Sequence, residues 1–213
     1  LFSPAEVETF RAEMAKGDLA PAVAHSSYLI NLASPDPALG EKSCQAMRDE
    51  LVRADQLGVP GIVLHPGAHM GQGEQAGLEL IGRRINELFD QTPRLSSGIW
   101  LETTAGQGTH LGWKFEHLAE LIERVENKAR IGVCLDTCHV FTAGYPVHTV
   151  AGVRETLKTF DRVIGLDWLR VIHINDSKKP LGSRLDRHEH IGQGLIGEEG
   201  FAAGLAAPAL KKI

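Results

Sequence analysis

Side chains of the types that bind metal ions recur along the chain at regular intervals. A histidine or a carboxylate ends each of five apolar runs, and three further groups of the same types stand in loops nearby. The eight residues are His25, His65, Glu102, Asp136, His139, His173, Asp186 and His188. Imidazole and carboxylate together, without thiolate, suit zinc or manganese and favour metal-assisted hydrolysis.

The spacing favours the interpretation that these eight residues form one metal site over the interpretation that each has a separate structural role. A single strand-end histidine is more often a hydrogen-bonded core residue, and a lone carboxylate can cap a helix or lie in a solvated loop. The five strand-end residues, however, follow one another at intervals of 34 to 40 residues, which is one helix-plus-strand unit each. Asp186 and His188 stand two residues apart, so in an extended loop they point the same way and could hold one ion together.

The elements that must position these residues alternate between two types. Near-continuous apolar runs, typical of parallel strands covered on both faces, predict strands at 22–25, 61–65, 98–102, 131–136 and 170–175. Apolar residues at helical spacing predict helices over 39–57, 78–88, 115–125 and 153–164, with Gly58 and Gly165 as stops. The alternation predicts an α/β fold with a parallel sheet.

The strand-end residues favour a (β/α)₈ barrel, or TIM barrel, over an open sheet. In a barrel the carboxyl ends of all strands form one face, where active sites lie, whereas in an open sheet they form a line. A barrel needs eight strands and typically about 250 residues. Five strands are visible in these 213 residues, so we expect a partial barrel that lacks about two N-terminal strands and the last strand. The final segment, 201–213, predicts a helix interrupted at Pro208.

The composition is that of an ordinary globular protein, with 43% hydrophobic and 23% charged residues. No apolar run approaches the roughly 18 residues of a membrane span, so we expect no membrane partner. The three cysteines, Cys44, Cys134 and Cys138, are too few for a disulfide framework and indicate a reducing, cytoplasmic setting. No linker divides the chain, which predicts a single domain over 1–213.

The net charge of −5 argues weakly against a nucleic-acid ligand. It does not exclude one, because bound divalent cations can reverse the local field of a site. Two loops could meet phosphates. The glycines of 103–108 would allow a phosphate to approach the backbone closely. Lys178 and Arg187 follow the predicted strand 170–175 and could contact phosphates on the predicted active face. Each feature alone is common on protein surfaces.

Seven segments together resemble endonuclease IV (deoxyribonuclease IV), the family of zinc-dependent apurinic/apyrimidinic endonucleases. They are HSSYLINL from His25, HPGAH from His65, LETTAGQG from Leu101, GVCLDTCH from Gly132, HINDSK from His173, DRH from Asp186 and GQG from Gly192. They follow one another in the family's order over nearly the whole chain.

The resemblance implies a trinuclear zinc site in a TIM barrel. The first zinc would take His25, His65 and Glu102; the second would share Glu102 and add Asp136 and His173; the third would take His139, Asp186 and His188. Glu102 would then be the catalytic residue that bridges two ions. The family has a further glutamate ligand of the second zinc at the end of the eighth strand, beyond Ile213, so we expect the second site to be weaker in this chain.

The resemblance also implies the reaction and the substrate. The partner is duplex DNA that contains abasic sites, and the enzyme acts as a monomer in base excision repair. It hydrolyses the phosphodiester on the 5′ side of the lesion and leaves a 3′-hydroxyl and a 5′-deoxyribose phosphate. Tyr28 and Leu29 match a loop that inserts into the DNA, and Lys178 and Arg187 are the expected basic DNA contacts.

A metal-dependent sugar isomerase or epimerase on a related barrel is the main alternative. Such enzymes also carry His, Glu and Asp at strand ends, but around one or two metals. Asp186 and His188 favour the nuclease, because they would provide ligands for a third metal ion that an isomerase does not need. A non-catalytic protein that has kept the barrel shape is disfavoured, because it would be expected to lose ligands.

Overall fold

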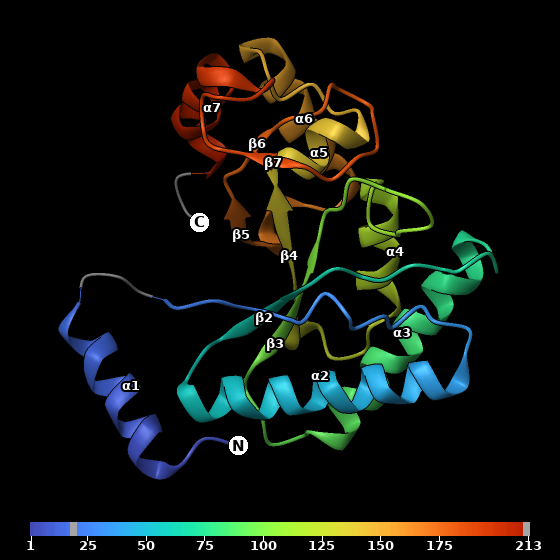
Figure 1. Cartoon of the computed structure of the whole chain (residues 1–213), viewed down its shortest axis with the longest axis vertical. Coiled ribbons are helices and arrows are strands. Elements are labelled where there is room, and N and C mark those ends of the chain that lie inside the picture. The colour runs from blue at the N-terminus through green and yellow to red at the C-terminus, as the bar shows by residue number, and fades with distance from the viewer. Residues whose placement is uncertain (18–20, 211–213) are drawn as a thin grey trace.

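A parallel sheet of five strands runs through the middle of the molecule, with helices packed around it (Figure 1). The computed structural model describes residues 1–17 and 21–210. Neighbouring strands pair in chain order, and every pair is parallel. The strands are β1 (Ala24–His25), β2 (Gly61–Leu64), β3 (Gly98–Glu102), β4 (Ile131–Asp136) and β5 (Leu169–His173). The predicted α/β fold with a parallel sheet is confirmed.

Helices connect the strands, and a small antiparallel hairpin follows the sheet. The α-helices are α1 (Pro4–Lys16), α2 (Pro37–Leu57), α3 (Glu74–Gln91), α4 (Phe115–Arg124), α5 (Thr137–Ala143), α6 (Val150–Val163) and α7 (Gly197–Ala206). Short 3₁₀ helices are η1 (Lys128–Arg130), η2 (Leu166–Trp168) and η3 (Pro208–Leu210), and the hairpin is β6 (Asp176–Ser177) with β7 (His188–Glu189). In Figure 1 the hairpin and α5 to α7 gather at one end of the sheet.

The core lies between the sheet and the helices. Every residue of β2, β3 and β4 is buried, as near-continuous apolar runs in parallel strands predict. The predicted stripes of α3 and α4 are buried as well, among them Ile81, Ile85 and Leu118, each 0% exposed. The predicted stop at Gly58 follows α2 in the left-handed conformation, with φ of 75°.

The two outer strands differ from the sequence prediction. β1 covers only two of the four predicted residues, and β5 ends at His173 instead of Asn175. At β5 the reason is local: the Thr137 hydroxyl accepts from the backbone N–H of Asn175 at 2.8 Å and donates to its carbonyl at 2.7 Å. These bonds hold Asn175 against the start of α5, so the chain leaves the sheet there.

The helix predictions also needed corrections. Leu39, the first residue of the predicted α2 helix, is 52% exposed. The buried stripe of α2 begins instead with the small residues Gly40 and Ser43, which hydrophobic spacing does not detect. Helix α1 was not predicted. Its apolar residues Val7, Phe10 and Met14 stand at helical spacing, but they are few, and none of the helix residues is fully buried. The predicted C-terminal helix begins earlier, at Gly197, and ends before Pro208; its last residues, 211–213, lie outside the described part of the chain.

Among the helices in the described ranges, none combines the length and the apolar composition that a membrane span requires.

Candidate metal centre

The carboxyl ends of the five parallel strands bring the predicted strand-end residues to one edge of the sheet. His25, Glu102, Asp136 and His173 are the last residues of β1, β3, β4 and β5, and His65 follows the last residue of β2. The parallel register sets this edge: His25 pairs with Val63, Glu102 with Cys134 and Asp136 with His173. Residues far apart in the sequence therefore meet around one point.

Glu102 lies at that point, with three imidazoles around a carboxylate that is 1% exposed. Its Oε2 is 2.8 Å from Nε2 of His25 and 3.0 Å from Nε2 of His65, and its Oε1 is 2.8 Å from Nδ1 of His173. Burial acts to raise the pKa of Glu102, but the hydrogen bonds from His173, His25 and His65 outweigh it and hold that pKa well below its ordinary value. The carboxylate is therefore ionised.

The hydrogen bonds of His25 show that this arrangement suits a cation. Nδ1 of His25 lies 2.8 Å from the carbonyl oxygen of Ser26, which can only accept, so Nδ1 carries the proton. Nε2 of the same ring faces the Glu102 carboxylate at 2.8 Å. It donates a hydrogen bond there when the ring is protonated, and in the neutral ring a metal ion can take the place of that proton. The pKa of His25 is raised, chiefly by this Glu102 contact.

A second cluster repeats the same chemistry beside the first. Nδ1 of His139 lies 2.8 Å from the carbonyl oxygen of Thr103, which leaves Nε2 to face Asp186 Oδ2 at 3.1 Å and His188 Nε2 at 3.3 Å. Burial lowers the pKa of His139, but the charge of Asp136, the hydrogen bond with Asp186 and the charge of Glu102 together outweigh it and raise the pKa to about 9. The pKa of Asp186 is lowered, first by its hydrogen bond with His139. Nitrogen and oxygen donors that converge in this way fit zinc.

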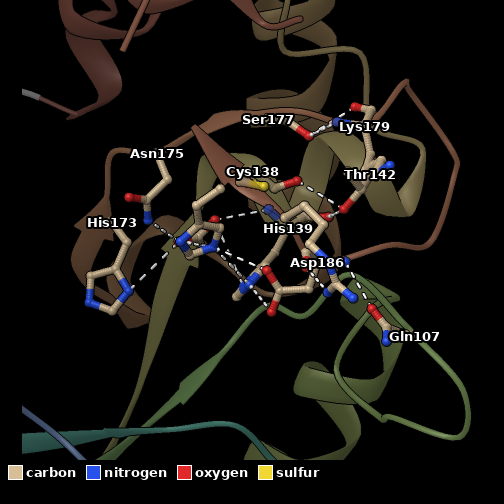
Figure 2. A network of polar contacts seen from close by, with 12 residues as sticks. Gln107, Cys138, His139, Thr142, His173, Asn175, Ser177, Lys179 and Asp186 are labelled. Atoms are coloured by element: carbon tan, nitrogen blue, oxygen red, sulfur yellow. Dashed lines mark hydrogen bonds and ion pairs between the residues drawn. The ribbon is translucent and has the colours of Figure 1, made fainter. Parts of the chain in front are cut away.

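Asp136 lies between the two clusters and is completely buried. Its Oδ1 accepts from the backbone N–H of His139 at 2.9 Å and so caps α5, which fixes the histidine on the first helical turn. Its Oδ2 accepts from the Asn175 side chain at 2.6 Å and lies 3.9 Å from Nδ1 of His173. Figure 2 shows His173, His139 and Asp186 in one network, with Asn175 beside it.

Potential ligand atoms gather into overlapping groups of three. Two groups match the predicted first and third sites: His25 with His65 and Glu102, and His139 with Asp186 and His188. For the middle site, Glu102 groups with Cys134 and His173, and separately with Asp136 and His139. We favour Asp136 over Cys134 as the middle ligand, because Cys134 is buried in an apolar cluster with Val63 and Trp100, as is usual for a free structural cysteine.

The loop that carries Asp186 is fixed to the rest of the site from several directions. Its residue Arg184 donates its backbone N–H to the carbonyl of Thr142 at 2.9 Å, and its guanidinium lies 3.7 Å from the centre of the Trp113 ring. The Gln107 side chain accepts from the backbone N–H of Asp186 at 3.2 Å (Figure 2). Sequence reasoning assigned no role to Gln107 or Asn175. The signal that could have found them was their place in the family-like segments LETTAGQG and HINDSK, which follow strands that end in ligand-type residues.

The residues expected to contact DNA lie outside both clusters. Tyr28 and Leu29, in the loop after β1, are 86% and 74% exposed. Arg187 is exposed and stands between Asp186 and His188. Lys178 has a partner on the neighbouring strand, with its Nζ 3.7 Å from Glu189 Oε2. Exposed apolar side chains on one loop and basic groups beside the ligands are compatible with an extended polyanion at this edge.

The fold and the site together place the chain in a known class. A family described as "Xylose isomerase-like TIM barrel" matches residues 2–213, which confirms the predicted TIM-barrel class. A curated protein of Chloroflexus aurantiacus named "Probable endonuclease 4" is 50% identical over 199 residues, or 93% of this chain and 70% of that protein. A protein of Geobacter sp. (strain M21) with the same name is 44% identical and is matched over 99% of this chain and 75% of its own length.

Solved structures agree with the sequence relatives. Endonuclease IV from Thermus thermophilus superposes with a TM-score of 0.86 at 38% identity, over 99% of this chain and 73% of that one. A D-tagatose 3-epimerase-like protein superposes with a TM-score of 0.72 at 22% identity, over 95% of this chain and 71% of its own, a likeness of fold alone. The chain belongs to the endonuclease IV family.

Proposed function

We propose that this protein is a DNA-repair endonuclease that hydrolyses the phosphodiester on the 5′ side of abasic sites in duplex DNA. The products would be a 3′-hydroxyl and a 5′-deoxyribose phosphate. The observation that carries the proposal is the pair of adjacent clusters around Glu102 and Asp186, in which imidazole nitrogens face carboxylate oxygens. Relatives named endonuclease 4, at 44% and 50% identity, support the assignment of this site to a nuclease.

Three zinc ions would occupy the site. His25, His65 and Glu102 would hold the first, Glu102 with Asp136 and His173 the second, and His139 with Asp186 and His188 the third. When bound, zinc acts as a Lewis acid toward phosphoryl oxygens and lowers the pKa of water, so that hydroxide is available as a nucleophile at neutral pH. Glu102, buried and ionised, would be the catalytic residue that holds two ions together, and Asp136 would keep His139 in place through its helix cap.

The acidic chain can bind DNA because the ions dominate the local field. The net charge of −5 is a sum over the whole protein, whereas three doubly charged ions would outweigh the carboxylates of Glu102, Asp136 and Asp186. Arg187 and Lys178 would contact phosphates around this edge. Tyr28 and Leu29 would enter the duplex at the lesion, where extrusion of the nucleotide costs least, since no base has to be unstacked.

The setting of the reaction forms part of the same proposal. We infer a monomer with one catalytic domain over 1–213, acting in the bacterial cytoplasm. The bacterial sources of the relatives and the three free cysteines support this location. The epimerase-like fold neighbour does not favour sugar isomerisation here, because at 22% identity it carries fold information only.

A duplex with one tetrahydrofuran abasic analogue tests the function directly. The analogue cannot undergo β-elimination, so a nick reports hydrolysis. The 213-residue chain and the complete product of its gene are incubated with this duplex, with and without prolonged chelation, and an undamaged duplex serves as the control. We expect a nick 5′ to the analogue that chelation abolishes and zinc restores. A protein that binds zinc and never nicks the analogue would rule out the nuclease, and sugar isomerisation would be tested next.

A further inference from the structure

Asp176 has a completely buried carboxylate that accepts five hydrogen bonds, all from backbone N–H groups. Its Oδ1 accepts from Ser177 at 2.7 Å and from Ile196 at 2.9 Å. Its Oδ2 accepts from Gly192 and Gly194, both at 3.0 Å, and from Gly197 at 3.3 Å. Four of these donors belong to a single loop, 192–197, which forms an anion-binding concavity around a carboxylate of its own chain.

The glycines of this loop are required by the arrangement. Gly192 and Gly197 adopt left-handed φ values of 78° and 70°. A Cβ at Gly194 would lie 2.5 Å from Asp176 Oδ1 and 2.5 Å from the Ser177 carbonyl oxygen, which is too close for any side chain. The loop is therefore shaped to fit the Asp176 carboxylate.

The same loop continues the segment that carries a ligand of the second cluster. Ser177, next to Asp176, pairs with His188 across the β6–β7 hairpin. The backbone N–H of Lys178 donates to the Arg187 carbonyl at 2.9 Å, and that of Leu195 donates to the Ser177 carbonyl at 2.8 Å. The chain from 187 to 197 thus wraps around β6, and Asp176 lies at the centre of the wrap.

The packing of His188 makes this support important. Its side chain is 44% exposed, so contacts with the core do not fix it. Its Nε2 nevertheless lies 3.3 Å from Nε2 of the buried His139. The hairpin register and the contact with Asp186 set that position, and the hydrogen bonds to Asp176 hold the segment after β7 against β6.

We propose that Asp176 is a positioning residue that builds the His188-bearing segment before any metal ion is bound. The inference rests on the proposed function of the centre, because it concerns the third ion's ligands. Both oxygens of the carboxylate already accept hydrogen bonds from backbone N–H groups, so Asp176 would not itself be a ligand of that ion. It presents His188 to His139 and Asp186 in a geometry that needs little reorganisation when the ion arrives, which raises affinity at that site alone.

Amide hydrogen exchange on the wild-type protein tests whether the segment is formed in advance. In chelated, metal-free protein, we expect the amides of Gly192, Gly194, Ile196 and Gly197 to exchange as slowly as those of β4. If they exchange at the rate of an open loop until zinc is added, the metal ion orders the segment and the proposal fails. This measurement needs no variant, so a folding defect cannot obscure it.

The Asp176→Asn variant tests the effect on the metal centre. The asparagine side chain places an NH₂ donor among backbone N–H groups that already point at this position. It also removes the negative charge that those N–H groups bind. We expect zinc affinity at one site to fall about 10–100-fold, the range for residues that support a ligand, with the other sites unchanged. Competition with a chromophoric chelator and the absorption spectrum of the cobalt-substituted protein report each site without any assay of activity.

The matched control is Asp55→Asn. Asp55 accepts from the backbone N–H of Ser96 at 2.7 Å and from its hydroxyl at 2.9 Å, near the start of β3 and far from the ligands. We expect all metal affinities of this variant to be unchanged. Unchanged affinities in Asp176→Asn, or an equal loss at every site, would overturn the positioning role. Failure of the wild-type protein to bind zinc at the site of His139, Asp186 and His188 would instead count against the proposed function. The hydrogen-exchange pattern would still test the role of Asp176.

Discussion

The Nε2 atoms of His139 and His188 lie 3.3 Å apart, and both face the Asp186 carboxylate. His139 is buried on the first turn of α5, whereas His188 is exposed on β7. Because Nδ1 of His139 donates a hydrogen bond to the Thr103 carbonyl, the Nε2 atom of that ring faces the same point and can offer it a lone pair when a metal ion replaces its proton. A cation is the ligand that such a point accommodates, and this relationship leads to the first prediction.

Replacement of His188 by alanine should remove one metal ion and leave the others. His188 is not among the ligands proposed for the other two ions, so zinc content by elemental analysis should fall by one equivalent, and nicking should be lost. His190→Ala, in the same exposed segment, is the control and should keep the zinc content of the wild type. An unchanged zinc content in His188→Ala would contradict its assignment as a ligand.

Replacement of Glu102 by glutamine should abolish cleavage and spare the binding of abasic DNA. The neutral amide cannot serve as the shared anionic partner of His25, His65 and His173. We expect the cleavage rate to fall by more than about 100-fold, the upper limit for groups that only support a ligand. Single-turnover nicking measures the rate, and Glu116→Gln, on the exposed face of α4, is the control. Full activity of Glu102→Gln would refute the bridging role.

Replacement of Tyr28 by alanine should weaken the binding of damaged DNA without changing the metal content. Its ring is 86% exposed, so truncation should not affect folding. A stacking contact contributes about 1–3 kcal/mol, and fluorescence anisotropy with the abasic duplex measures the loss. Leu205→Ala, which removes another exposed apolar side chain on α7, should bind as the wild type does. Equal weakening in both variants would argue against a specific role for the loop after β1.

Acid should remove a stabilising interaction at the start of α3. The Lys114 ammonium, 2.8 Å from Glu74, holds the pKa of that carboxyl below its ordinary value. A depressed folded-state pKa stabilises the protein above the unfolded pKa, and the effect is lost as pH falls through the folded value. Because Glu74 is 40% exposed, screening limits the effect to below about 1 kcal/mol.

Chemical denaturation at several pH values measures this contribution. Glu74→Gln should be less stable than the wild type at pH 7, and the difference should vanish below the ordinary glutamate range. Lys114→Met should remove the same contribution. The double variant should therefore lose less free energy of unfolding than the sum of the losses in the two single variants. Strict additivity of the two changes would show that the pair does not interact.

Local patterns in the sequence were sufficient to predict the parallel strands and most of the helices. β2, β3 and β4 are buried throughout, so their apolar runs are continuous and their polar last residues stand out. Where burial is partial the pattern fails. Helix α1 has no buried residue, and the buried stripe of α2 starts at Gly40, where the neighbour is the guanidinium of Arg84 and not an apolar side chain.

The sequence by itself determined which chemical groups the strand ends and loops carry, because residue type and strand position are local properties. Only the tertiary structure decided how these groups meet. Glu102 lies 77 residues from His25 and 71 from His173, and parallel pairing, together with the curl of the sheet, brings all three within hydrogen-bonding distance. The burial of Asp176 and the amides around it also depend on a loop that folds back over β6. Contacts of this kind arise from long-range packing, which a residue's own neighbours in the sequence do not encode.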